Sequence, residues 1–120
     1  MAKRLAAELW IKLKLPGAGQ IGPGKIELLK KIDQHGSMAA AARAMGMSYR
    51  RAWLLVDELN KLFTKPLVEK HLGGSTQGGA SLTDFGRQLV QRYDALVRGS
   101  IDANGEHLAA IAKCVRRPAK

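Results

Sequence analysis

The chain has 120 residues and a formal net charge of +10, because 20 Lys and Arg stand against 10 Asp and Glu. Its hydrophobic fraction of 46% can form a core, which excludes wholesale disorder and suits a single domain. The lone cysteine, Cys114, excludes an internal disulfide and a multi-cysteine metal site, and it fits a reducing cytoplasm. A composition this basic favours a polyanionic partner, either nucleic acid or an anionic membrane surface.

The N-terminal residues begin with basic side chains, as a signal peptide does, but Glu8, Lys12 and Lys14 interrupt the apolar run that such a peptide needs. No segment approaches the ~20 apolar residues of a membrane span. The sequence therefore predicts a cytoplasmic protein with no membrane partner.

The first elements in chain order are a strand, a loop and a helix. Residues 9–15 alternate between apolar and polar side chains, which is typical of a half-buried strand. Residues 16–24 are rich in glycine and proline, so we expect a connecting loop there. A helix is predicted over residues 25–35, and Gly36 supplies its C-terminal stop.

The loop contains two glycine patterns that occur in phosphate-binding sites, G-x-G-x-x-G at 17–22 and G-x-x-x-x-G-K at 19–25. Ile26 stands where the second pattern needs a hydroxyl group for Mg²⁺, and Pro23 removes a backbone N–H. The chain also lacks the further apolar strands of a parallel nucleotide-binding sheet. We therefore favour a plain connection over nucleotide binding.

No set of residues fills the nucleophile, base and oxyanion roles of an enzyme. His35, His71 and His107 lie far apart in the sequence, and no carboxylate is spaced with them as a metal pair. The sequence therefore predicts no enzyme, no metal site and no cofactor.

Two helices follow that are separated by a very short gap. Ser37 is a predicted N-cap for an alanine-rich helix, which ends at Gly46. Ser48 is the predicted N-cap of a longer helix over residues 48–63, and Pro66 prevents its continuation. Only Met47 lies between the two helix signals, and this spacing is a helix-turn-helix signature.

A hairpin and a helical C-terminal part complete the chain. Short strands are predicted at 67–72 and 80–82, with the glycine-rich stretch between them as the tip of a wing. Thr83 is the predicted cap of a helix that Gly99 and the pair Asn104–Gly105 interrupt, and a last amphipathic helix follows. The predicted fold class is mainly α with a small β component. It is a winged helix-turn-helix with a three-helix core, a β-hairpin wing and a C-terminal dimerisation helix.

The first turn of the second helix of the motif is the part that reaches base edges in recognition helices. An arginine there can donate two hydrogen bonds to guanine, and a tyrosine can contact phosphate or a thymine methyl group. A capping serine leaves backbone N–H groups facing a phosphate, and a leucine one turn later lies either in the groove or in the core. The predicted DNA contacts in the helix-turn-helix are Ser37, Ser48, Tyr49, Arg50, Arg51 and Leu54.

The wing tip contains many glycines and no acidic residue. Glycines allow main-chain N–H groups to approach phosphate oxygens, and small polar side chains offer neutral hydrogen bonds. The alternative is an ordinary flexible hairpin tip. The predicted DNA contacts in the wing are Gly74, Ser75, Thr76, Gln77 and Gly78.

Three motifs together resemble the DNA-binding domain of the ModE family, the molybdate-responsive bacterial regulators, and more distantly the winged helix of LysR-type regulators. The run at 48–53 corresponds to the family's Ser-Tyr-Lys-x-Ala-Trp, and Gly73–Gly79 corresponds to its glycine-rich wing. Leu82, Thr83 and Gly86 correspond to its Leu-Thr-x-x-Gly.

The resemblance implies a dimeric transcription regulator in which the helix over residues 84–97 helps to form the dimer. Arg50 departs from the family pattern, since it replaces a point charge with a bidentate fork. Family members also carry C-terminal oxyanion-binding modules. The sequence ends shortly after the match, so we expect no molybdate binding from this chain alone.

We expect residues 1–82 to form the DNA-binding domain and residues 83–120 a helical dimerisation segment with a basic tail. An exposed apolar stripe on a helix is a partner surface, so the stripe at Phe85, Leu89, Tyr93 and Leu96 predicts a homodimer. The leading function is sequence-specific binding of double-stranded DNA for transcription regulation. The alternatives are an architectural DNA binder without sequence preference and a protein-interaction module.

Overall fold

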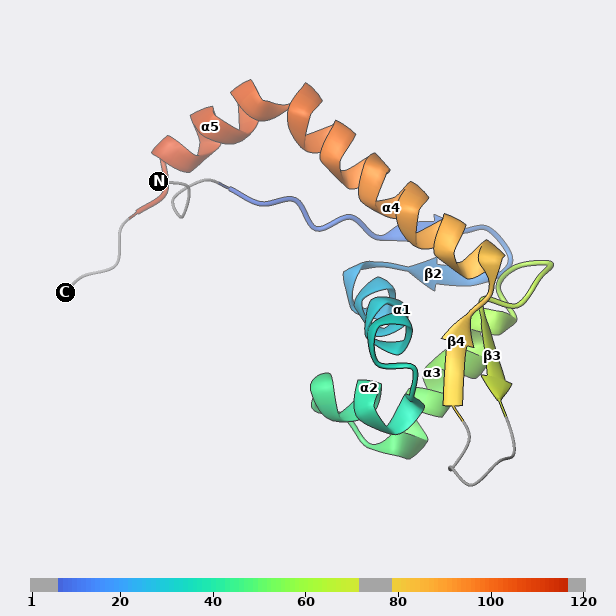
Figure 1. Cartoon of the computed structure of the whole chain (residues 1–120). Coiled ribbons are helices and arrows are strands. Elements are labelled where there is room, and N and C mark those ends of the chain that lie inside the picture. The colour runs from blue at the N-terminus through green and yellow to red at the C-terminus, as the bar shows by residue number, and fades with distance from the viewer. Residues whose placement is uncertain (1–6, 72–78, 117–120) are drawn as a thin grey trace.

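A computed structural model describes residues 7–71 and 79–116. Three helices and a hairpin form the body of the molecule, and a helical arm extends away from it (Figure 1). The predicted fold class, a mainly α winged helix-turn-helix with a small β component, is confirmed. The body contains α1 (Pro23–His35), α2 (Met38–Ala44), α3 (Tyr49–Asn60), β3 (Val68–His71) and β4 (Gly79–Leu82) together with an N-terminal hairpin, and the arm consists of α4 (Asp84–Ala103) and α5 (Gly105–Lys113).

The N-terminal region differs from the prediction, because it forms a hairpin rather than one strand and a loop. β1 (Leu13–Leu15) is shorter than predicted, and β2 (Gly19–Ile21) pairs with it in antiparallel register. The turn between them has Gly17 at φ 76°, a left-handed conformation that glycine adopts without strain. The Gly-Gln-Ile sequence of β2 has little strand propensity, yet Ile21 is buried in the core, and this tertiary packing decides the outcome.

The core lies between α1, the inner faces of α2 and α3, and the wing strands. Helix α1 buries Ile26, Leu28, Leu29 and Ile32, because α2, α3, α4 and β4 all contact it. The inner face of α3 buries Ala52, Val56 and Leu59, which recur at helical spacing. The remaining large buried side chains include Leu67, Val68 and Leu82 at the base of the wing.

Helix α4 continues through Gly99, so the predicted interruption there is wrong. One glycine costs a helix only ~1 kcal/mol, which the neighbouring turns of a 20-residue helix offset. The break occurs at Asn104, whose side-chain amide donates a hydrogen bond to the Ser100 carbonyl at 2.8 Å. None of the described helices is long and apolar enough to cross a membrane.

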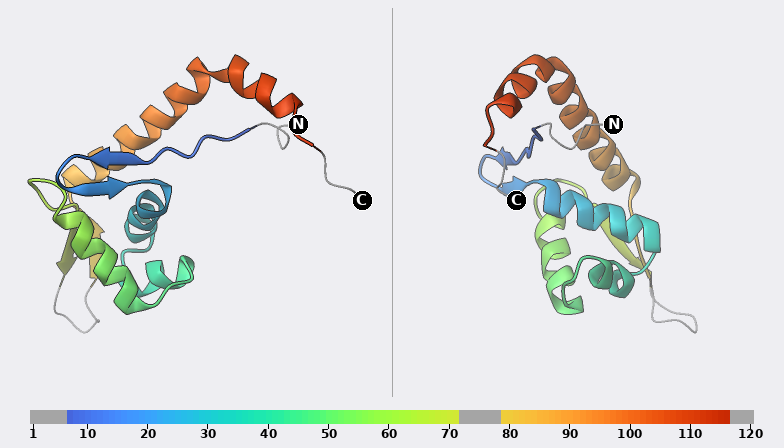
Figure 2. Two further views of the ribbon diagram at one scale, coloured as in Figure 1. Left: turned by 180° about the vertical axis from the view of Figure 1, so that it is seen from behind. Right: turned by 90° about the vertical axis from the view of Figure 1, so that its left-hand side faces the viewer.

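Contacts from α1 and the N-terminal segment fasten α4 to the body. The Lys30 ammonium lies 2.9 Å from the Asp94 carboxylate, and the Tyr93 hydroxyl donates a hydrogen bond to the Ile11 carbonyl. Burial, and secondarily the nearby Asp94 carboxylate, raises the pKa of Tyr93 above its ordinary value, which extends to higher pH the range in which this donor is protonated. The N-terminal segment therefore runs beside α4, as views from two sides show (Figures 1 and 2).

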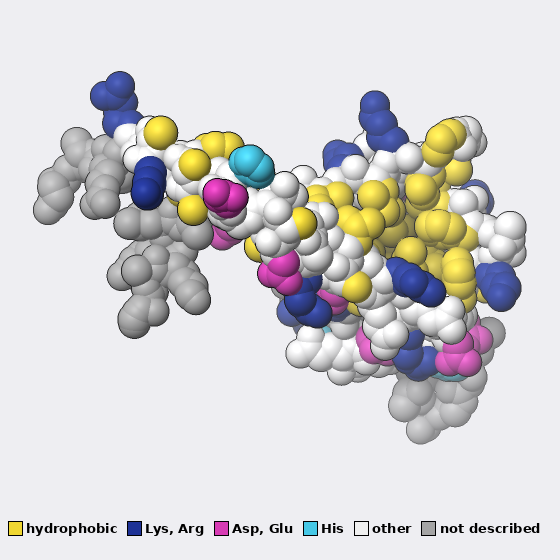
Figure 3. Space-filling model, turned by 90° about the horizontal axis from the view of Figure 1, so that it is seen from above, with side chains coloured by type: hydrophobic (Ala, Val, Ile, Leu, Met, Phe, Trp, Pro, Cys, Tyr) yellow, Lys and Arg dark blue, Asp and Glu magenta, His cyan; other side chains and the backbone are white. Residues whose placement is uncertain are grey.

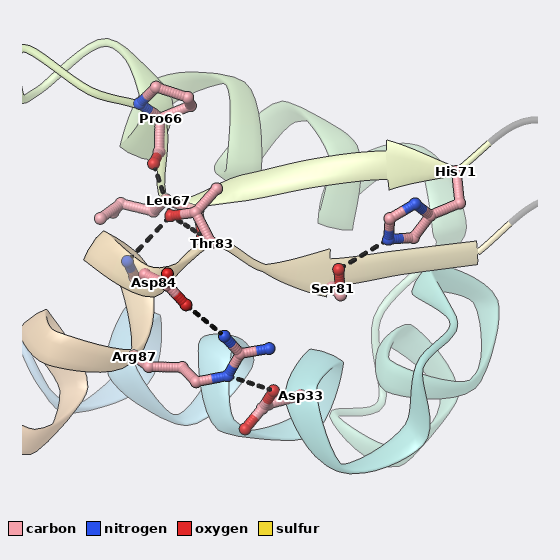
Figure 4. Close-up of polar contacts among 9 residues, drawn as sticks. Asp33, Pro66, Leu67, His71, Ser81, Thr83, Asp84 and Arg87 are labelled. Carbon is pink, nitrogen blue, oxygen red and sulfur yellow. Dashed lines mark hydrogen bonds and ion pairs between the residues drawn. The ribbon is translucent and has the colours of Figure 1, made fainter.

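A close backbone contact joins α4 to the start of the wing. Thr83 caps α4 by accepting from the Gly86 N–H at 2.9 Å, and its hydroxyl donates to the Pro66 carbonyl at 2.8 Å (Figure 4). The Thr83 N–H donates to the Leu67 carbonyl at 2.9 Å. A Cβ atom on Gly86 would overlap that same carbonyl oxygen. Only glycine therefore fits at position 86 without moving the chain.

We predict that Gly86→Ala lowers the free energy of unfolding by about 1–3 kcal/mol, the usual cost of overpacking a rigid site. Gly99→Ala is the matched control in the same helix, since, apart from its chain neighbours and the nearby backbone of α4, no described atom lies within 4 Å of the Cβ that it adds. It should raise stability by about 0.5–1 kcal/mol. Urea unfolding followed by circular dichroism measures both, and equal stabilities of the two variants would contradict this packing.

Candidate nucleic-acid interface

Serine side chains cap both helices of the helix-turn-helix. The Ser37 hydroxyl accepts from the Ala40 N–H at 3.2 Å, and the Ser48 hydroxyl accepts from the Arg51 N–H at 3.0 Å. Between the helices Gly46 adopts φ 69°, which lets the chain turn sharply from α2 into α3. The predicted helix-turn-helix and both of its N-caps are confirmed.

The predicted base-reading residues share the outer face of α3. Tyr49 is 57% exposed and Leu54 is 51% exposed, and Arg50 and Arg51 are exposed as well. Leu54 therefore does not belong to the core. Of the two positions that the sequence left open for it, the DNA groove and the core, the core is excluded. The helix buries its opposite face, so its orientation on the body is fixed and these four side chains point outward together.

The helix-turn-helix carries positive charge that no carboxylate offsets. Residues 34–56 contain no Asp or Glu, whereas Arg43, Arg50 and Arg51 lie within this span. Among the described residues, none of these three arginines takes part in an ion pair. The ion pairs instead involve α1, α4 and the last turns of α3. Arginines without a carboxylate partner keep their donors free for an anionic ligand.

The wing strands leave the body at the same end as α2 and the start of α3 (Figures 1 and 2). They pair in antiparallel register, and a hydrogen bond of 2.7 Å joins the His71 ring to the Ser81 hydroxyl across the hairpin (Figure 4). The Ala80 N–H donates to the Gly36 carbonyl at 3.3 Å, which anchors β4 to the end of α1. The wing strands and the helix-turn-helix with its exposed arginines therefore lie on one face.

The glycines of the wing do not all play one role. A Cβ atom on Gly79 would lie 2.7 Å from the Gly36 carbonyl oxygen, so this glycine is needed for close backbone packing within the fold. The predicted DNA contacts at the tip lie outside the described residues. These are Gly74, Ser75, Thr76, Gln77 and Gly78.

Sequence reasoning missed the residues that connect α3 with the wing. The side-chain oxygen Oδ1 of Asn60 accepts from the N–H groups of Leu67 and Val68 at 2.8 and 3.2 Å, and its side-chain Nδ2 donates to the Val68 carbonyl at 3.1 Å. Asn60 thus ties the end of the recognition helix to the first residues of β3. An asparagine shortly before a Pro-containing turn was the only sequence signal for this role.

A second connection joins α3 to β3, closer to the outer face of α3. The Lys70 ammonium of β3 lies 4.6 Å from the centroid of the Trp53 ring of α3. The same ring meets the Tyr49 ring edge to face, with centroids 6.4 Å apart and an interplanar angle of 78°. Three side chains therefore form a continuous row from the first turn of α3 to the wing.

The capped turn motif, the outward arginines and the adjoining hairpin define a winged helix-turn-helix protein. The family model described as "Bacterial regulatory helix-turn-helix protein, lysR family" matches residues 24–87, which contain α1, α2, α3 and the wing. The chain therefore belongs to the lysR family of bacterial regulatory helix-turn-helix proteins.

Curated relatives match most of this chain. The transcriptional regulator ModE of Haemophilus influenzae is 40% identical over 91 residues, which cover 76% of this chain and 36% of the relative. The DNA-binding transcriptional dual regulator ModE of Escherichia coli K12 is 40% identical over 94 residues, or 78% of this chain and 36% of the relative. The molybdenum-pterin-binding protein MopA of Rhodobacter capsulatus is 43% identical over 86 residues, or 72% and 32%.

The predicted resemblance to ModE regulators is thus confirmed. The chain spans about a third of the length of the curated relatives that it matches. The similarity therefore concerns one part of those proteins. The family-model match spans the turn motif with Tyr49, Arg50 and Arg51.

We predict that Arg50→Ala and Arg51→Ala separate base reading from phosphate contact. If an arginine donates two hydrogen bonds to guanine, its replacement should weaken binding to the preferred site by about 1–3 kcal/mol. The base preference at that position should also relax. Fluorescence anisotropy with the preferred duplex and a scrambled duplex measures this. Arg92→Ala, an exposed arginine on α4, is the control and should leave both affinities unchanged. Equal losses on both duplexes for Arg50→Ala and Arg51→Ala would reject base reading by this pair.

Proposed function

We propose that this chain binds double-stranded DNA in a sequence-specific manner in the bacterial cytoplasm and thereby regulates transcription. The observation that carries the proposal is the outer face of α3. Its first turn presents Tyr49, Arg50 and Arg51 in a segment without a single carboxylate. The family and the ModE relatives support the same function.

In this proposal the first turns of α3 enter the major groove, and Arg50 and Arg51 read guanine edges there. Leu54, one turn later, offers an apolar contact for a thymine methyl group. The capped start of α2 at Ser37 faces the phosphate backbone with its N–H groups. The wing, on the same face, follows the neighbouring backbone.

The test of DNA binding is selection from a random duplex pool, followed by a salt titration of the recovered sequence. We expect one sequence to be enriched and to bind 10³–10⁷ times tighter than random DNA, roughly the range for specific binders. The logarithm of affinity should fall linearly with the logarithm of KCl concentration, with a slope steeper than roughly −4. A flat salt response would contradict DNA binding, and binding without enrichment would instead favour an architectural role.

We also propose that residues 1–82 form the DNA-binding unit and that residues 83–120 mediate a homodimer. Seen from the side of α4 and α5, hydrophobic side chains gather over the first half of α4, with others along the arm (Figure 3). Leu96 and Ile101 on α4 and Ile111 and Val115 near the C-terminal end are exposed. An exposed apolar surface of this extent supports a partner.

The four predicted dimerisation residues contribute in different ways. Leu96 is exposed, and Phe85 and Leu89 are half-buried against the core. Tyr93 is only 6% exposed, because it lies under the N-terminal segment, so its effect on a dimer would be indirect. Beside it a groove of about 490 Å³ runs between α4 and that segment, with Trp10 and Ile101 in its lining.

We predict a dimer at micromolar concentration in sedimentation velocity, with an operator of two inverted half-sites. Leu96→Glu together with Ile101→Glu places charge on the exposed surface and should shift the protein to monomer without lowering its thermal stability. Arg92→Glu on the same helix controls for added negative charge. A monomeric unmodified protein would contradict the proposal.

The absence of molybdate binding by this chain stays a prediction.

A further inference from the structure

The strongest unexplained contact on the DNA-facing side is the row of Tyr49, Trp53 and Lys70. Trp53 is half-buried and packs against the core cluster. It meets the Tyr49 ring edge to face and the Lys70 ammonium at 4.6 Å from its centroid. Tyr49 and Trp53 are four residues apart on α3, so they share a face of the helix, whereas Lys70 comes from β3.

We propose that Lys70 contacts a DNA phosphate and that Trp53 is the positioning residue that holds its ammonium group in place. This inference rests on the proposed DNA binding and extends it by one backbone contact at the junction of the recognition helix and the wing. Neither residue was among the contacts predicted from the sequence. Trp53 acts through its neighbours, because its half-buried ring already contacts Tyr49 and Lys70.

The chemistry of a lysine over an aromatic ring supports this assignment. A free lysine side chain loses much rotamer freedom when it must hold one position, so a contact that restricts it beforehand favours binding. A carboxylate could restrict it too, but it would neutralise the charge that attracts phosphate. The ring face restricts the ammonium group and leaves its full positive charge. Among the described residues Lys70 makes no ion pair.

The position of Lys70 in the hairpin supports the same conclusion. Successive side chains of a strand point to opposite sides, so Glu69 and His71 lie on the other face from Lys70. The His71 ring is engaged with Ser81 across the hairpin. Lys70 shares the face of the buried Val68, turns toward α3 and lies one residue before the wing strand ends. A groove-bound helix and a backbone-bound wing leave a phosphate strand between them at this point.

The chain contains a matched control for this contact. The Lys65 ammonium lies 5.8 Å from the centroid of the Phe85 ring, so it is also a lysine beside an aromatic side chain. It follows the C-terminal end of α3, whereas Tyr49 begins that helix. About 17 Å separates the two ends of such a helix. Removing the charge of Lys65 tests for a general effect of net charge on DNA affinity.

The experiment compares Lys70→Gln, Lys70→Arg and Lys65→Gln by salt titration of affinity for the selected duplex and for a scrambled one. Lys70→Gln should weaken both complexes equally and reduce the salt slope by about 0.9 for each subunit on the DNA. If one such contact is lost, the ratio of the unmodified protein's affinity to that of Lys70→Gln should fall by about 3.5-fold when the salt concentration rises from about 50 to about 200 mM. Lys70→Arg should retain the slope, because guanidinium also stacks on an aromatic face. Lys65→Gln should also retain it.

The role of Trp53 is tested by Trp53→Leu, alone and combined with Lys70→Gln. If the ring positions the ammonium group, Trp53→Leu should lower the salt slope, which a change in stability alone would not do. Lys70→Gln should then cost far less in the Trp53→Leu background than in the unmodified protein. Thermal unfolding verifies that each variant is folded, and if Trp53→Leu is not, Trp53→Met replaces it and should lower the slope in the same way, because it also removes the ring face.

The outcomes separate this inference from the proposed function. An unmodified protein that does not bind DNA contradicts the proposed function itself. An unmodified protein that binds with a steep salt slope, and a Lys70→Gln variant with the same slope, contradict only the phosphate contact. Lys70→Gln could lower the slope while its effect on affinity simply adds to that of Trp53→Leu in the double variant. That result would leave Lys70 as a contact and overturn the positioning role of Trp53.

Discussion

The backbone of Leu67 is the point on which the arrangement of the whole molecule depends. Its N–H donates to the side chain of Asn60 at the end of the recognition helix. Its carbonyl accepts from the Thr83 N–H and lies so close to Gly86 that no Cβ fits between them. One buried residue at the entry of β3 therefore joins α3, both wing strands and the start of α4.

This junction has a consequence for function. Because α3 and the wing meet at Leu67 through short hydrogen bonds, their relative angle is set before any ligand arrives. Preorganisation of that kind lowers the entropy cost of binding an extended partner. Arg87 of α4 also forms an ion pair with Asp33 of α1, which links the two helices, and a second one with Asp84 of its own helix (Figure 4). The arm thus begins on a rigid base that it shares with the DNA-facing surface, and a partner bound to the arm would be fixed in orientation relative to that surface.

The features that the sequence predicted correctly are those decided over a few residues. A serine or threonine that caps a helix acts on an N–H three positions later, so Ser37, Ser48 and Thr83 could be recognised without the fold. The inner face of α3 follows from helical spacing for the same reason. Strand β2 was missed because its three residues have little strand propensity, and Ile21 is held by packing with distant elements.

The candidate site was predictable in its exposed residues and less so in its supports. Arg50 and Arg51 could be placed by their distance from the cap. The partners of Trp53 and Asn60 come from β3 and from the entry to it, and the distance along the chain says nothing about which side chains meet. The predicted interruption at Gly99 was wrong because a glycine that ends one helix is tolerated inside another when the helical turns on both sides continue.

The central claim is that the face formed by α2, α3 and the wing binds DNA. A nuclear magnetic resonance titration of the labelled protein with a short duplex tests it directly, since each backbone amide reports separately. The account predicts that the largest shifts occur at residues 37–56 and in the described wing strands 68–71 and 79–82, with little change along residues 105–113. Shifts concentrated on α4 and α5, with the amides of Tyr49, Arg50 and Arg51 unaffected, would contradict it.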